Sequence, residues 1–161
     1  MNLIKINKES GIPLIGVIAF GIIDRGSNLI QIRPTTICNL NCIFCSTDAG
    51  IKSRCHQVIY EVELNYLLEW IKEIINFKKE NVEANIDSVG EATCYPKIIE
   101  LIKGIKEING VSRISMQSNG TLLTKEKIKQ LEKAGLNRIN LSIHSLNKEL
   151  AQKLSGTETY N

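Results

Sequence analysis

Apolar residues recur at helical spacing in two long segments of this chain. In the first segment they fall at i, i+3, i+4, i+7, i+10 and i+11: Leu64, Leu67, Leu68, Ile71, Ile74 and Ile75. The second segment follows Pro96, and its apolar positions are Ile98, Leu101, Ile102, Ile105 and Ile108. Proline is well tolerated at the start of a helix. Each pattern covers one face of a helix, so both segments predict amphipathic helices packed on a core.

Short runs rich in apolar residues alternate with these helices. They predict four strands, at residues 29–33, 84–89, 111–117 and 138–143. Further helices are expected between the cap Thr124 and Gly135, and over residues 147–154. Strict alternation of strands and helices predicts an α/β fold with a parallel sheet and right-handed crossovers. Ligands of such sheets bind beyond the carboxyl ends of the strands, where we expect the chemistry of this chain.

The first 28 residues precede this alternation. Their apolar run, residues 11–23, is too short to span a bilayer, lacks a small-residue cleavage site and continues into the first predicted strand. Its glycines and β-branched residues predict a core β-hairpin. We therefore predict an N-terminal hairpin extension over residues 1–28, a core domain over residues 29–161 and no membrane association.

Composition narrows the class of protein. The chain has 161 residues, of which 43% are hydrophobic and 23% are charged, as in an ordinary globular domain. A net charge of +3 with 5% aromatic residues provides neither a basic tract nor a stacking platform for nucleic acid. Five cysteines, three of them crowded together, do not suit a secreted disulfide framework. We expect reduced thiols and a cytoplasmic protein.

The crowded cysteines are Cys38, Cys42 and Cys45, spaced C-x3-C-x2-C directly after the first predicted strand. Iron-sulfur clusters normally take four cysteine thiolates, so three leave one iron of a four-iron cluster without a protein ligand. A ferredoxin run supplies four cysteines, and a structural zinc site takes two close pairs; neither pattern is present. We interpret the segment as an iron-sulfur site. The alternative is a zinc-binding structural module or a group of buried cysteines.

This spacing, with Phe44 directly before the third cysteine, resembles the radical S-adenosylmethionine (radical SAM) superfamily. Three further segments resemble motifs of that family, in the same order along the chain. Residues 90–92 resemble its Gly-Gly-Glu-Pro motif, residues 118–121 its Thr-Asn-Gly segment, and residues 140–145 its fourth-strand motif. Val89 replaces the first glycine of the Gly-Gly-Glu-Pro motif, and Ala92 replaces its proline.

The resemblance covers about residues 30 to 160 and implies a set of cofactors. Cys38, Cys42 and Cys45 would each ligate one iron of a [4Fe-4S] cluster, and SAM would chelate the fourth iron through its amino and carboxylate groups. An electron from the reduced cluster would cleave SAM to methionine and a 5′-deoxyadenosyl radical, which abstracts hydrogen from a substrate. An electron donor such as flavodoxin or ferredoxin is implied as a partner. Residues 141–147 are similar to cyclases of molybdenum cofactor biosynthesis, but this stretch recurs widely in the superfamily, so no substrate is predicted.

The resemblance also implies a set of residues that contact SAM. They are Phe44 beside the adenine; Gly90, Glu91 and Ala92 near the ammonium; Ser142 and His144 near the ribose or methionine part; and Ser118 and Asn119 near SAM or the substrate. Gly90 fits a close approach of backbone to ligand because it lacks a Cβ. The alternatives are a core-packed Phe44, an inert Ser142, a surface His144 and an ordinary turn at Asn119. For Cys55 and Cys94 the alternatives are a second metal site, a catalytic thiol, or buried or incidental cysteines, and we favour the last, so neither is assigned a role.

The family fold is a partial (β/α)6 barrel, and the predicted elements supply its first four strand-helix units. Residues 138–143 would then be an unpaired strand at the edge of a parallel sheet, an arrangement that proteins normally cover. We expect a complementary subunit or a second copy of the chain at this edge, as in a split enzyme. The alternative function is a non-catalytic iron-sulfur subunit or remnant.

Overall fold

The main sheet of the computed structural model has five strands in the order β2-β3-β5-β6-β7, and the structure describes residues 2–55, 58–79 and 81–158. The strands are β2 (Gly21–Asp24), β3 (Leu29–Arg33), β5 (Val82–Ile86), β6 (Val111–Ser118) and β7 (Arg138–Leu141). β3, β5, β6 and β7 are parallel, and only β2 is antiparallel to its neighbour. The predicted α/β chain with a mostly parallel sheet is confirmed.

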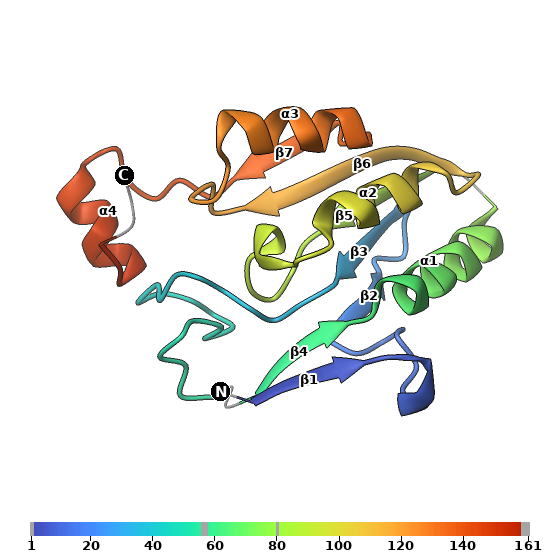
Figure 1. Ribbon diagram of the computed structural model, residues 1–161, viewed down its shortest axis with the longest axis horizontal. Helices are drawn as coiled ribbons and strands as arrows, with labels where there is room; N and C mark the ends of the chain where they lie inside the picture. The colour runs from blue at the N-terminus through green and yellow to red at the C-terminus, as the bar shows by residue number, and fades with distance from the viewer. Residues whose placement is uncertain (1, 56–57, 80, 159–161) are drawn as a thin grey trace.

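Three helices pack on this sheet and a fourth lies beyond it (Figure 1). They are α1 (Leu64–Lys78), α2 (Ile98–Lys106), α3 (Lys125–Ala134) and α4 (Lys148–Ser155), with short 3-10 helices at η1 (Lys8–Ser10) and η2 (Ala92–Cys94). The predicted apolar stripes form the core, because Leu67 and Ile71 of α1 and Leu101 and Ile105 of α2 are fully buried. α4 instead lies next to the cysteine segment at the carboxyl ends of the strands.

The two faces of the sheet differ in chemistry. Successive strand residues point to opposite faces. Ile32 of β3, Ile86 of β5 and Met116 of β6 are fully buried in the core cluster that also contains the inner faces of α1, α2 and α3. Apart from Leu29, the residues that alternate with them are polar, and Asp87 continues this alternation just after β5. We call their side of the sheet the open face; its polar residues are Gln31, Arg33, Glu83, Asn85, Asp87, Arg113, Ser115 and Gln117.

The hairpin predicted within residues 1–28 does not form. β1 (Asn2–Ile6) pairs in parallel with β4 (Val58–Val62), a strand that we had not predicted. Gly21 begins β2 with φ +90°, a Cβ there would lie 2.2 Å from the Leu14 carbonyl oxygen, and the hairpin is made by β2 with β3. The error has a physical reason, since the β1–β4 pair joins segments more than fifty residues apart and local patterns do not report such a pairing.

The second and fourth predicted strands, residues 84–89 and 138–143, end earlier than we predicted. β5 ends at Ile86 and β7 at Leu141, so residues 87–91 and 142–146 form loops at the carboxyl ends. Within the described residues, β7 pairs with β6 alone. No helix in the described ranges is both long and apolar enough to cross a bilayer.

Candidate active site

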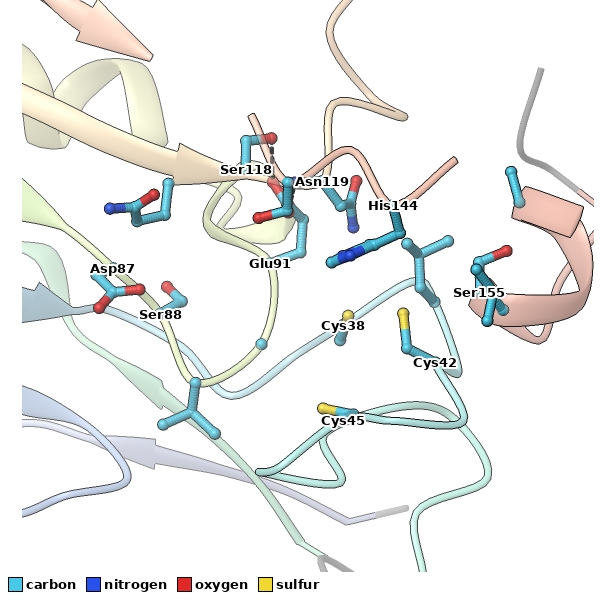
Figure 2. A pocket seen from close by; sticks show the side chains of 17 residues that line it. Cys38, Cys42, Cys45, Asp87, Ser88, Glu91, Ser118, Asn119, His144 and Ser155 are labelled. Carbon is cyan, nitrogen blue, oxygen red and sulfur yellow. Dashed lines mark hydrogen bonds between the residues drawn. The ribbon is translucent and has the colours of Figure 1, made fainter. Parts of the chain in front are cut away.

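A cavity of about 230 Å³ lies beyond the carboxyl ends of β3, β5, β6 and β7 (Figure 2). Its walls come from the cysteine segment, the loop after β5, the end of β6, the segment after β7 and one side of α4. The predicted site residues among its lining are Cys38, Cys42, Cys45, Gly90, Glu91, Ser118, Asn119, Ser142 and His144. Five segments far apart in the sequence therefore meet at one place, where ligands of parallel sheets bind.

The three predicted ligand thiols all line this cavity (Figure 2). Cys38, Cys42 and Cys45 are each partly exposed. Among the residues that the structure describes, no three Cys, His, Asp or Glu side chains are close enough to share one metal ion. A zinc ion gathers its ligands about a single centre, whereas each thiolate of an iron-sulfur cluster binds a different iron. Three thiols on the lining of one cavity are a donor set that suits an iron-sulfur cluster.

The thiols differ in their readiness to ionise. Burial raises the pKa of Cys38 to about 11, and the Glu91 carboxylate adds to this effect. Burial also raises the pKa of Cys42. For Cys45 burial acts in the same direction, but the Thr47 hydroxyl, 3.2 Å from its Sγ, and nearby backbone N–H groups lower the pKa below its usual value. A thiol must lose its proton to bind metal. Metal binding therefore has to offset the largest cost of deprotonation at Cys38 and the smallest at Cys45.

Gly90 is needed where the loop after β5 crosses the cysteine segment. A Cβ at Gly90 would lie 2.0 Å from the Ile37 carbonyl oxygen and 2.6 Å from that of Thr36. The Glu91 backbone N–H donates to the same Ile37 oxygen at 2.7 Å. We had attributed this glycine to a close approach of ligand; the structure shows that the close approach is to the backbone just before Cys38. Its contact with SAM stays a prediction.

Glu91 joins three segments through its carboxylate. Its Oε1 accepts hydrogen bonds from the Thr93 N–H and hydroxyl and from the Ser118 hydroxyl, and its Oε2 accepts from the Asn119 N–H at 2.7 Å. The side chain is 3% exposed. Buried carboxylates need such partners, and because Oε2 accepts a single bond from these residues it keeps capacity to accept another. Glu91 therefore fixes the end of β6 against η2, and its predicted bond to the SAM ammonium stays a prediction.

The remaining predicted SAM contacts lie at or beside the cavity. The Ser142 N–H donates to the Ser118 carbonyl, which extends the β6–β7 ladder to the cavity wall. Phe44 is 48% exposed, and its ring packs edge-on against His144 with the ring centroids 4.4 Å apart. The Asn119 side chain donates to Asn39 of the cysteine segment. Ala92 is buried in η2 and, like Phe44, is absent from the cavity lining.

The two cysteines without a predicted role stay outside the cavity lining. Cys55 is exposed. Cys94 ends η2, and burial raises its pKa to about 11, with Glu91 and Cys38 adding to the shift.

α4 holds the cysteine segment through backbone contacts that sequence analysis did not anticipate. The Asn41 N–H donates to the Ser155 carbonyl at 2.8 Å, and the Ile43 N–H donates to the Leu154 carbonyl at 3.0 Å. Carbonyl groups at the end of a helix lack partners within the helix, so these bonds satisfy both elements. Gly156 permits the contact, because it has φ +65° and a Cβ there would lie 2.3 Å from the Asn41 carbonyl oxygen.

Polar residues that we had not predicted as site residues lie on the wall formed by the sheet. Asp87 and Ser88 follow β5 directly, Gln117 lies near the end of β6, and all three line the cavity. The signal was present, because polar residues alternate with apolar ones along both strands. We had used those strands only to place the family motifs.

A family model described as the radical SAM superfamily matches residues 32–161, which is most of the chain. The chain belongs to the radical SAM superfamily. Members of the superfamily typically use a [4Fe-4S] cluster and SAM, and the cysteines of the family motif are present here as Cys38, Cys42 and Cys45.

Similar proteins extend well beyond the region that this radical SAM chain covers. An uncharacterized protein of Methanocaldococcus jannaschii is 48% identical over 153 residues, which is 93% of this chain and 35% of that protein. A GTP 3′,8-cyclase of Alkaliphilus metalliredigens is 36% identical over 135 residues, which is 81% of this chain and 39% of the cyclase. The chain thus spans less than half the length of these relatives.

The fold is also similar to that of a solved structure. BtrN, in a crystal structure described as a complex with AdoMet and 2-DOIA, matches with a TM-score of 0.62 at 16% sequence identity. The match covers 79% of this chain and 50% of BtrN. The likeness is one of fold.

Proposed function

We propose that this chain is the cluster-holding, SAM-cleaving part of a radical SAM enzyme. The observation that carries the proposal is the meeting of three thiols with four other segments around one cavity at the carboxyl ends of the strands. We also propose that the elements from β3 to α4 form four of the six strand-helix units of a partial (β/α)6 barrel.

The proposal gives the residues of the cavity defined tasks. The [4Fe-4S] cluster is held by Cys38, Cys42 and Cys45. When it is bound and reduced, it supplies the electron that cleaves SAM. Glu91 fixes Ser118 and Asn119 in place by hydrogen bonds, and Ser142 and His144 form the wall from which SAM is contacted. We propose that a flavodoxin or ferredoxin delivers the electron. The substrate of the GTP 3′,8-cyclase relatives is not transferred to this chain, because more than half of their length lies outside the matched region.

The test is the response of the reconstituted cluster to SAM. We expect that SAM added to the reduced protein under anaerobic conditions changes the electron paramagnetic resonance spectrum, because SAM would bind the iron that lacks a protein ligand. We also expect formation of 5′-deoxyadenosine and methionine. S-adenosylhomocysteine, which lacks the sulfonium methyl group, is the control and should yield no 5′-deoxyadenosine. A spectrum that ignores SAM would support the alternative of a non-catalytic iron-sulfur subunit.

We further propose that a complementary subunit or a second copy of the chain covers the free edge of β7. The edge is flanked by apolar side chains that are unusually exposed: Leu141 at 52%, Ile143 at 59% and Leu146 at 96%. A strand with unpaired N–H and C=O groups beside such residues is a template for another strand.

We expect the isolated protein to self-associate at micromolar concentration when no partner is present, as measured by analytical ultracentrifugation. Replacing Ile143 with glutamate should weaken this association at least about tenfold, because a charge would be buried in the contact. Replacing the exposed Phe77 of α1 with glutamate is the matched control and should have no effect. A well-folded wild-type monomer that cleaves SAM unaided would contradict the proposal.

A further inference from the structure

Buried polar atoms without partners lie on β3 and in the loop that follows β5. Among the described residues, three buried side-chain nitrogen or oxygen atoms have no hydrogen-bond partner: Gln31 Oε1, Arg33 Nε and Ser88 Oγ. The first two belong to β3, and the third follows β5, its neighbour in the sheet. Buried polar atoms are nearly always paired, since each unpaired group costs about 1–3 kcal/mol. Of the three residues only Ser88 lines the cavity, so its hydroxyl is the unpaired atom that a molecule bound there would reach.

Asp87 lies at the centre of this group. The Gln31 side-chain amide donates to Asp87 Oδ2 at 2.6 Å, and the Asp87 N–H donates to the Ile32 carbonyl. Burial raises the pKa of Asp87, while the charges of Arg33 and Arg25 act in the opposite direction. Arg33 itself is held by a hydrogen bond from its Nη1 to the Ile18 carbonyl. The carboxylate is therefore fixed from the side of β3, which orients it.

Asp87 and Ser88 form a wall of the cavity that is separate from the thiols. Figure 2 shows them on one side of the cavity, with Cys38, Cys42 and Cys45 on another. Gln117, from the neighbouring strand β6, lines the cavity as well. A molecule bound on this wall would face the thiols across the cavity. Neither the family motifs nor the predicted SAM contacts include these three residues.

We propose that Asp87, Ser88 and Gln117 are a substrate subsite that binds vicinal hydroxyl groups, as found on a sugar, a cyclitol or a ribose. The inference rests on the proposed function, because it places the substrate in the cavity that would hold SAM. A hydroxyl group both donates and accepts, and this wall offers both: the carboxylate accepts, the serine hydroxyl does either, and the glutamine amide has one end of each kind. A carboxylate also binds ribose hydroxyls in dinucleotide-binding folds.

The charges around Asp87 favour this class of ligand over two others. A phosphate or carboxylate group would be repelled by Asp87 at the wall. A cationic amine would be repelled by Arg33 and Arg25. The charges of these two residues already act on Asp87, where they lower the pKa against the effect of burial. A neutral group with paired donors and acceptors avoids both costs.

The test uses the anaerobically reconstituted protein with SAM bound, and myo-inositol as the probe. Saturation-transfer NMR should detect binding of myo-inositol but not of cyclohexanol, which has the same ring and a single hydroxyl group. Asp87→Ala and Ser88→Ala should each weaken myo-inositol binding at least about tenfold, as expected for loss of a hydrogen bond at a buried site. Asp24→Ala, at the end of β2 and outside the cavity lining, is the matched control and should bind like the wild type. Iron content and SAM binding should stay unchanged in all variants.

The outcomes separate this inference from the function on which it rests. Wild-type protein that binds iron and SAM but not myo-inositol, or binding that survives in both Asp87→Ala and Ser88→Ala, overturns the subsite and leaves the proposed function standing. Wild-type protein that binds neither iron nor SAM overturns both. If Asp87→Ala does not fold, Ser88→Ala and Gln117→Ala decide, and loss of myo-inositol binding with SAM binding retained supports the subsite.

Discussion

Replacing Cys42 with alanine will remove most of the iron from the reconstituted protein. With Cys42 gone, two of the three thiols that line the cavity remain, and a cluster of four irons would have two irons without protein ligands. Changes to residues that merely orient metal ligands typically reduce metal affinity about 10- to 100-fold, so loss of a ligand should reduce it by more. Iron and sulfide content and the visible absorption of the cluster measure the effect. Near-normal values for all three would show that the cluster assignment is wrong.

Cys55→Ala and Cys94→Ala are the matched controls, because both remove a thiol without touching the cavity lining. Cys55 is exposed, and we expect its replacement to leave the iron content unchanged. Cys94 lies close enough to Cys38 to influence its neighbour electrostatically, so its replacement is the more demanding control. If Cys94→Ala lost iron as Cys42→Ala does, the ligand set would have to include a fourth thiol.

Local patterns predicted the layers of the fold because those layers are built from local signals. The stripe that includes Leu67 and Ile71 is buried, as its helical spacing requires. Thr124 caps α3 by accepting a hydrogen bond from the Lys127 N–H, and Gly135 ends that helix in the left-handed conformation. Alternation of such helices with apolar strands then fixed a mostly parallel sheet. The pairing of β1 with β4 has no local signal, and it was missed.

For the candidate site, the sequence likewise predicted which segments meet but not which residues contact one another. The motifs that carry Cys38, Gly90, Ser118 and Ser142 follow strand ends, so the topology of a parallel sheet brings them together, and the structure has them around one cavity. The sequence does not indicate what each residue contacts within the protein. Glu91 accepts hydrogen bonds from its neighbour Thr93 and from Ser118 and Asn119 at the end of β6, and the bonds to β6 follow from the three-dimensional arrangement alone.

Gly90 shows how one residue links the stability of the fold to the geometry of the candidate cluster site. Its φ lies outside the positive range that favours glycine, so an alanine would be tolerated by the local backbone. The obstacle is the cysteine segment, whose Ile37 carbonyl oxygen would lie 2.0 Å from the new Cβ. Backbone atoms on both sides are tied together by the bond from the Glu91 N–H to that same oxygen, so neither side can move without losing it.

We therefore expect Gly90→Ala to lower the free energy of unfolding by about 2–4 kcal/mol, the sum of an overpacking cost and the loss of one hydrogen bond. Urea denaturation of the cluster-free protein measures this loss. Gly104→Ala is the matched control: its Cβ would come within 2.5 Å of Leu68, but the obstacle there is the end of a flexible side chain. In α2 the alanine also favours the helix by up to about 1 kcal/mol, so we expect a much smaller loss than at Gly90.

Because Ile37 directly precedes Cys38, Gly90→Ala should also reduce iron incorporation, while Gly104→Ala should not. Equal stability losses in the two variants would mean that the contact between the β5 loop and the cysteine segment is not the constraint that makes Gly90 necessary.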